Sequence, residues 1–279
     1  MLLTVLNVTT AVIYLMAAIA AWISKSHLQP TEYSDAADGS NPAGIAKILI
    51  WLGIMLHGVA LFDAMFLEEG WNIGFSHTSS LIGWLTLLSY VVLGNDARLT
   101  RLAELYLAPL AIVAALLPTL LPSEHVVVYG GWAFRLHIAV AIAGYALFTV
   151  AALHALLMLF LEKRLQSGTL NSLDSQLPPL MRVEKLLFRL LFAAFVLLTI
   201  TLISGVFFSE AVYGKAFTAT YKTVFAAISW LIFGGLLLGH WQAGWRGKTA
   251  VRWTLIGFVM LLLAYAGSKF VLEFILKRI

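Results

Sequence analysis

Eight long apolar runs are the feature of this sequence that most restricts its fold. About 20 helical residues cross the hydrocarbon core of a bilayer, and each run is long enough to do so. An apolar run in hydrocarbon must be helical, because its backbone groups have to pair within the segment. The predicted spans are 2–23, 44–67, 74–94, 103–122, 132–161, 186–208, 222–241 and 253–275. We therefore expect an all-α fold, a polytopic membrane helix bundle of about eight transmembrane helices.

The composition supports this expectation and leaves little room for anything else. Only 11% of the residues are charged, whereas about 25% is usual for a soluble domain. Eight spans use about 160 of the residues, so residues 1–279 are predicted to form a single integral membrane domain. No Lys or Arg precedes the first apolar run, so we interpret it as a retained helix and not as a secretion signal.

The distribution of Lys and Arg predicts an orientation. Twelve of the 18 basic residues lie in the first, third, fifth and seventh connections between spans. The positive-inside rule assigns those connections to the cytoplasm, with both termini on the periplasmic side of a bacterial inner membrane. The net charge of +4 therefore reflects topology and does not indicate nucleic-acid binding.

Three histidines within the spans are candidates for a functional site. His57, His137 and His240 lie in the second, fifth and seventh spans, and His57 and His137 share a helix face with small residues that allow close helix packing. An ionisable group inside a span is costly and is a functional candidate by default. The simpler interpretation of each is a core histidine that is hydrogen-bonded to a carbonyl. His154 lies on a bulkier face.

The residue types present narrow the chemistry further. The chain has no cysteine, which excludes disulfides, iron–sulfur clusters and thiolate zinc sites. Neutral imidazole then remains as the obvious ligand for haem iron or another metal. No carboxylate lies at the centre of a span, which weakens the case for a proton-driven transporter. His27, His77 and His125 lie in or beside connections and are expected to be solvated.

The second half of the chain resembles a known family of membrane proteins. Four stretches carry the resemblance: Leu136-His137 running into Gly144-Tyr145-Ala146, Leu177-Pro178-Pro179-Leu180 with Glu184, Leu198-Thr199 through Ser204-Gly205, and His240 followed by Gly244-Trp245-Arg246-Gly247. Together they resemble the cytochrome c assembly family of haem-handling membrane proteins, the CcsA/CcmC type, and most closely its short YpjD-like inner-membrane branch. The resemblance is strong over residues 132–270 and holds only in outline before them.

The resemblance implies a set of haem-binding residues. In that family two histidines within the membrane ligate haem, and His240 matches one of them; His57 is the candidate for the other. His137 matches the first of two outer histidines. Arg246 is among the nearest cations for the haem propionates, and haem b is the implied cofactor.

The chain also departs from the family pattern. The outer connection 209–221 contains no Trp and no Asp, although the family has a Trp-rich segment ending in Trp-Asp there. The last span carries no second outer histidine. We therefore expect a haem-binding protein that is not a complete cytochrome c synthase. The alternative is a haem-free structural or regulatory subunit that docks a partner membrane protein through the basic linker 162–189. A small-solute transporter is the least favoured class.

Overall fold

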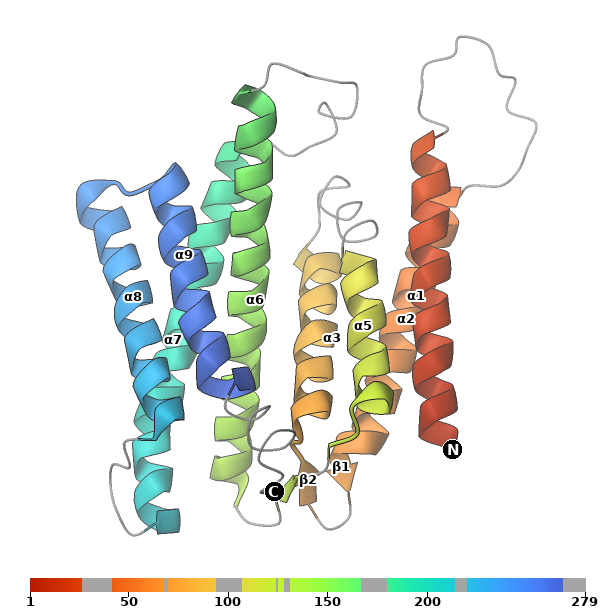
Figure 1. Ribbon diagram of the computed structural model, residues 1–279, viewed down its shortest axis with the longest axis horizontal. Coiled ribbons are helices and arrows are strands. Elements are labelled where there is room, and N and C mark those ends of the chain that lie inside the picture. Colours follow the sequence, from red (N-terminus) through yellow and green to blue (C-terminus); the bar gives the residue numbers. More distant parts are fainter. Residues whose placement is uncertain are drawn as a thin grey trace. The chain divides into compact units, whose positions relative to one another are not determined.

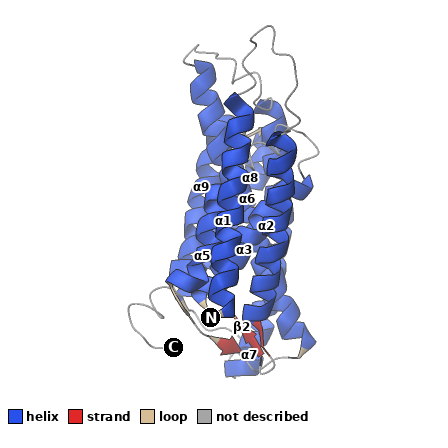
Figure 2. Ribbon diagram, turned by 90° about the vertical axis from the view of Figure 1, so that its right-hand side faces the viewer, coloured by secondary structure: helices blue, strands red, loops and turns tan. Residues whose placement is uncertain are grey.

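The computed structural model describes residues 1–26, 42–67, 70–93, 107–123, 125–127, 131–166, 180–213 and 220–267. The chain divides into two compact units, Met1–Val126 and Val127–Ile279. Helices make up nearly all of the described residues, and the few strands lie beyond the helix ends (Figure 2). The expectation of one integral membrane domain stays a prediction.

Unit 1 is built from four helices that pack in a closed circuit (Figure 1). The helices are α1 (Leu2–Ser26), α2 (Pro42–Met65), α3 (Phe75–Leu93) and α5 (Ala108–Leu120). Helix α1 packs against α2 and α5, and α3 packs against α5 and α2. Three short strands follow at one end in the order β1-β2-β3: β1 (Phe66–Leu67), antiparallel to β2 (Gly70–Asn72), and β3 (Val126–Val127).

Side-chain hydrogen bonds connect the helices of unit 1. Asn7 on α1 donates to Thr119 on α5 (3.1 Å), and the Trp84 indole on α3 donates to the Ile54 carbonyl on α2 (2.7 Å). Close packing accompanies them, because a Cβ at Gly53 would lie 2.5 Å from the buried Tyr14 ring. The small residues of α2 therefore face the bundle interior, as the sequence predicts.

Unit 2 is a second closed circuit of four helices (Figure 1). The helices are α6 (Trp132–Gln166), α7 (Leu180–Tyr213), α8 (Tyr221–Ala243) and α9 (Gly247–Leu262), and α9 continues as the π-helical segment η3 (Leu263–Gly267). Contacts run from α6 to α7, α7 to α8, α8 to α9 and α9 back to α6.

The centre of unit 2 is a stack of aromatic rings. The buried Phe148 ring on α6 lies parallel to the buried Phe233 ring on α8, with centroids 4.1 Å apart. Gly257 on α9 lies so close that a Cβ there would be 2.8 Å from Phe233. Below this stack, the Tyr145 hydroxyl donates to the Leu261 carbonyl (3.0 Å), where α9 changes to the π-helix.

The outer surface of the helices matches a membrane. Among the described residues, six helices are long and apolar enough to cross a bilayer, and only 17–39% of each apolar window is buried. Many of the side chains exposed on the helix surfaces are Ile, Leu, Val and Phe, as expected for a protein whose solvent is lipid. This confirms the predicted class, a polytopic membrane helix bundle.

Several helix bounds differ from the predicted spans. Helix α7 begins at Leu180, six residues before the predicted span, and α9 begins at Gly247, six residues before it. Helix α5 is described from Ala108, with Pro109 in its first turn, while residues 103–106 of the predicted span lie outside the described residues. Residues 268–275 of the last predicted span, the basic residues Arg98 and Arg101, and most of the connections lie outside the described residues.

Candidate functional site

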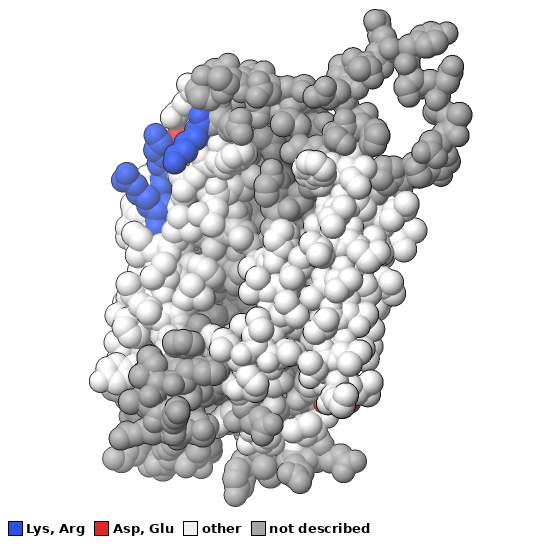
Figure 3. All heavy atoms as spheres, turned by 45° about the vertical axis from the view of Figure 1, so that its right-hand side comes forward, with Lys and Arg blue, Asp and Glu red and all other residues white. Residues whose placement is uncertain are grey.

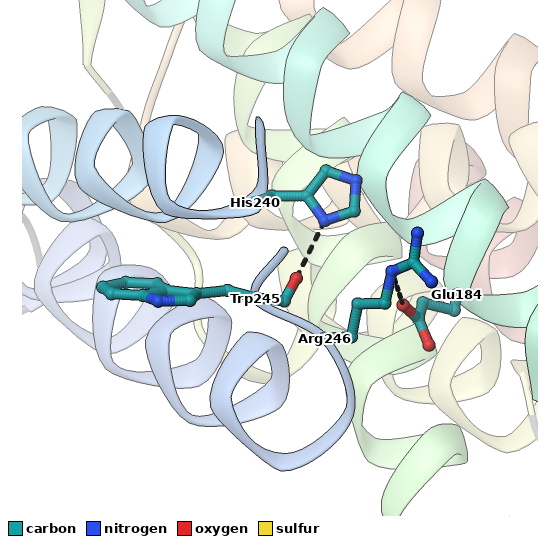
Figure 4. A network of polar contacts seen from close by, with 4 residues as sticks. All are labelled: Glu184, His240, Trp245 and Arg246. Carbon is teal, nitrogen blue, oxygen red and sulfur yellow. Dashed lines mark hydrogen bonds and ion pairs between the residues drawn. The ribbon is translucent and has the colours of Figure 1, made fainter. Parts of the chain in front are cut away.

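His240 lies at the end of α8 and is held by the turn that follows it. Its Nδ1 lies 2.8 Å from the Trp245 carbonyl oxygen, and its ring stacks on the Phe188 ring of α7 with centroids 3.5 Å apart. Figure 4 shows the other ring nitrogen, Nε2, pointing away from the Trp245 carbonyl. The ring is thus fixed by one hydrogen bond and one aromatic face.

This hydrogen bond determines the tautomer of His240. A carbonyl oxygen only accepts hydrogen bonds, so Nδ1 must carry the proton. The neutral ring then has its lone pair on Nε2, and no other described residue bonds to that nitrogen. A histidine that donates Nδ1–H to a backbone carbonyl and presents Nε2 is arranged as metal-ligating histidines usually are.

Charged side chains surround this end of unit 2. Arg246 Nε lies 3.7 Å from Glu184 Oε1, and Lys248 Nζ lies 3.4 Å from Glu162 Oε1. The arginine side chain is 70% exposed, whereas that of Glu184 is 18% exposed. On the face shown in Figure 3, Lys and Arg side chains gather near one end, with an acidic side chain among them.

His137 is a second histidine with an available nitrogen. Its Nδ1 lies 2.7 Å from Ser204 Oγ, and that hydroxyl donates its proton to the Ile200 carbonyl (2.6 Å). When the hydroxyl donates to that carbonyl, it accepts from Nδ1–H, and the lone pair of the neutral ring is then on Nε2. The rings of Phe134 and Phe208 flank the imidazole.

His57 in unit 1 is bonded differently. Its ring is 1% exposed, with Nε2 2.9 Å from Ser80 Oγ and Nδ1 3.4 Å from the Tyr14 hydroxyl. Three helices therefore meet at this imidazole, and both of its nitrogens are engaged. Binding of iron at either nitrogen requires that one of these hydrogen bonds be broken.

The remaining histidines have structural environments. His154 is buried and donates Nδ1–H to the Val150 carbonyl of its own helix (2.9 Å), so its hydrogen bond is of the same kind as that of His240. The prediction that His77 is solvated is wrong: the residue is 7% exposed, and its ring bonds to the Ser123 carbonyl (3.1 Å). His77 is buried because the first turn of α3 packs against the segment that contains Ser123. At that contact the Ser76 and Ser123 hydroxyls are hydrogen-bonded to each other. His125 is half-buried, and His27 lies outside the described residues.

The predicted site residues of unit 2 fall at two separate places. His240 and Arg246 lie together at one end of unit 2, and His137 lies at the other end (Figure 1). Twenty-five residues of α6 separate His137 from Glu162, which pairs with Lys248 at the His240 end, and that is about 37 Å of helix. His137 and His240 of one chain therefore cannot ligate the same iron. His57 belongs to unit 1.

Sequence reasoning missed the partners that orient these histidines. The sequence spacing does not mark Phe188 or Ser80 as a neighbour of a histidine. Ser204 and Trp245 differ, since both lie in stretches that carry the family resemblance.

The donor set suits a haem better than a bare metal ion. Haem iron takes one or two imidazole ligands, and an imidazole with its Nε2 lone pair available meets that need at His240 and at His137. Within the described ranges, no group of three or more His, Asp or Glu side chains is arranged to hold a metal ion. Arg246, beside His240, offers a cation of the kind that binds carboxylates.

These features define a multi-pass helical membrane protein whose membrane-embedded histidines are oriented by hydrogen bonds. The model of the cytochrome c assembly protein family matches residues 45–276, so the chain belongs to that family. The matched region includes His57, His137, His240 and Arg246.

Individual relatives agree with this assignment. The inner membrane protein YpjD of Escherichia coli K12 is 28% identical over 235 residues, which cover 83% of this chain and 88% of the relative. A 28.8 kDa protein of Azospirillum brasilense from a nifR3-like 5′ region is 34% identical over 215 residues, or 74% of this chain and 78% of that protein. The cytochrome c biogenesis protein CcsA of Chlamydomonas reinhardtii is 27% identical over 138 residues, covering 50% of this chain and 38% of CcsA.

Proposed function

We propose that this chain is a haem-binding protein of the cytochrome c assembly type, with His240 as the principal iron ligand. The observation that carries the proposal is the hydrogen bond from His240 Nδ1–H to the Trp245 carbonyl. It leaves Nε2 as the lone-pair nitrogen, which is the state that ligates haem iron. When bound, the haem would supply redox chemistry that the side chains lack.

Arg246 is proposed to bind a haem propionate. Arg246 lies in the turn after α8, near His240 (Figure 4). The atom of Arg246 that contacts Glu184 is Nε. The two terminal nitrogens of the guanidinium therefore stay available for a carboxylate. We propose haem b, because the chain itself has no cysteine for a covalent haem link.

His57 and His137 take different roles in this proposal. His57 is the candidate second axial ligand, and it would exchange its bond to Ser80 or Tyr14 for one to iron. His137 would serve a separate haem-contact position near the other end of unit 2. The outer connection has no Trp-Asp motif, so a complete cytochrome c synthase activity is not proposed.

The proposed location is a bacterial inner membrane with both termini outside. Support comes from the YpjD relative, named as an inner membrane protein, and from the bias of Lys and Arg. Within unit 2 the C-terminal end of α6 and the N-terminal end of α7, which carry basic residues, lie at the same end as the basic turn between α8 and α9 (Figure 1). Phosphatase and fluorescent-protein fusions at each terminus test the orientation, and a cytoplasmic N-terminus would overturn it.

The absorbance spectrum of the purified full-length protein tests haem binding. We expect a Soret band after addition of ferric haem b in detergent, with a low-spin form if two histidines bind. His240→Ala and Arg246→Gln should weaken binding, and His57→Ala should remove the low-spin form. His125→Ala is the matched control, since it lies outside the proposed site. A wild-type protein without a Soret band before and after haem addition would sink the proposal.

One observation favours the haem-free alternative. Both nitrogens of His57 are already hydrogen-bonded within unit 1, as in a purely structural histidine. In that case the chain would be a structural or regulatory subunit, docking another membrane protein through the basic linker 162–189, of which 167–179 lie outside the described residues. Purification in mild detergent distinguishes the two, because this alternative requires a retained partner and no haem spectrum.

A further inference from the structure

The turn between α8 and α9 contains two residues in a backbone conformation that favours glycine. Gly244 and Gly247 have φ values of 65° and 53°, in the left-handed region that favours glycine. They bracket Trp245 and Arg246. The Trp245 N–H donates to the Gly239 carbonyl (3.1 Å), and its indole packs tightly against Gly239. The two glycines thus point the Trp245 carbonyl back at His240 and send Arg246 toward α7.

One face of α7 contacts both parts of this arrangement. Glu184 and Phe188 are four residues apart, so they lie on the same side of the helix. Glu184 contacts the Arg246 guanidinium, and Phe188 stacks on the His240 ring with an interplanar angle of 14°. Phe188 is 8% exposed, so its ring cannot easily turn away.

We propose that Glu184 and Phe188 are positioning residues that hold His240 with its Nε2 available. Glu184 restrains the turn through Arg246, which keeps the Trp245 carbonyl in place as the acceptor for Nδ1–H. Phe188 fixes the plane of the ring. This inference rests on the proposed function only where it concerns haem, because the geometry itself belongs to the protein without ligand.

Neither contact is strong alone. An ion pair with one largely exposed partner contributes at most about 1 kcal/mol, a factor of about five in an equilibrium. The direct hydrogen-bond partner of a metal-ligating histidine matters more, because its removal changes metal affinity by about 10- to 100-fold, and for His240 that partner is the Trp245 carbonyl. The two contacts therefore act on orientation much more than on folding, and the variants are expected to remain folded.

The first test uses the full-length protein without haem. Glu184→Gln should speed hydrogen–deuterium exchange of the Trp245 amide about two- to fivefold. It should also speed modification of His240 by diethyl pyrocarbonate, measured by mass spectrometry. Glu162→Gln is the matched control, because it breaks the other ion pair at this end of unit 2, which Lys248 makes from the first turn of α9 and which involves neither Arg246 nor Trp245. Equal effects of the two variants would overturn the inference.

The second test uses ferric haem b. Glu184→Gln and Phe188→Leu should each raise the Kd for haem about two- to fivefold and increase the high-spin fraction, while Glu162→Gln should leave both unchanged. If the wild type binds haem and the Glu184→Gln and Phe188→Leu variants bind it with the same Kd, the positioning role is refuted. If the wild type binds no haem, the proposed function fails, and the exchange experiment still decides whether the two residues hold the turn.

Discussion

Replacing Ser80 by alanine tests the hydrogen-bond chain that joins three helices of unit 1 at His57. The Ser80 hydroxyl lies 2.9 Å from His57 Nε2, and the ring is 1% exposed, so water cannot replace the lost partner. A buried polar group left without its hydrogen bond costs about 1–3 kcal/mol, although interhelical bonds in membranes average about 0.6 kcal/mol. We expect Ser80→Ala to lower the free energy of unfolding by about 1–2 kcal/mol.

The geometry also predicts an order of effects. Tyr14→Phe removes a longer contact, 3.4 Å to Nδ1, and should cost about 0.5 kcal/mol or less. Ser89→Ala on the same helix is the control, because that hydroxyl bonds only to the Leu85 carbonyl of its own turn (2.6 Å). Reversible unfolding in mixed detergent micelles, followed by circular dichroism, measures all three. A Ser80→Ala protein as stable as Ser89→Ala would refute the reasoning.

Three further predictions follow from single positions. Gly244→Ala should lower the free energy of unfolding by about 1 kcal/mol through the left-handed backbone alone, since no atom lies within 4 Å of the added Cβ. Gly244→Asn should cost less, because asparagine tolerates that backbone better, and equal melting temperatures of the two variants would contradict this. Gly257→Ala should cost about 1–3 kcal/mol by overpacking against the enclosed Phe233 ring, which thermal unfolding measures. Ser204→Ala removes the acceptor for His137 Nδ1–H, so nitrogen NMR should show mixed tautomers where the wild type shows one.

The apolar runs predict the helices well because lipid contact forces both composition and backbone pairing. The predicted starts of α7 and α9 are each six residues late. The first turns of these two helices carry charged residues and precede the apolar run. An apolar run does not predict helical residues that lie outside it. Glu184 and Lys248 lie in those extensions, so the predicted spans stop short of the residues that surround His240.

The candidate ligands could be predicted from the sequence, whereas their orientation could not. His137, His57 and His240 are identified by the cost of placing imidazole in a span. Their hydrogen bonds to Ser204, to Ser80 and to the Trp245 carbonyl decide which nitrogen is available. The first two of these bonds join residues that are distant in sequence, and the third depends on a turn with two left-handed glycines. All three can therefore be identified only from the folded structure.

The closed circuit of contacts in each unit has a consequence for how the protein is made. All four described helices of unit 1 find their neighbours within residues 1–126, which leave the ribosome first. The N-terminal half can therefore complete its packing in the bilayer before the C-terminal half is synthesised, as domains commonly do during translation. Two separately expressed halves, divided near Val127, should each insert and resist proteolysis when made alone.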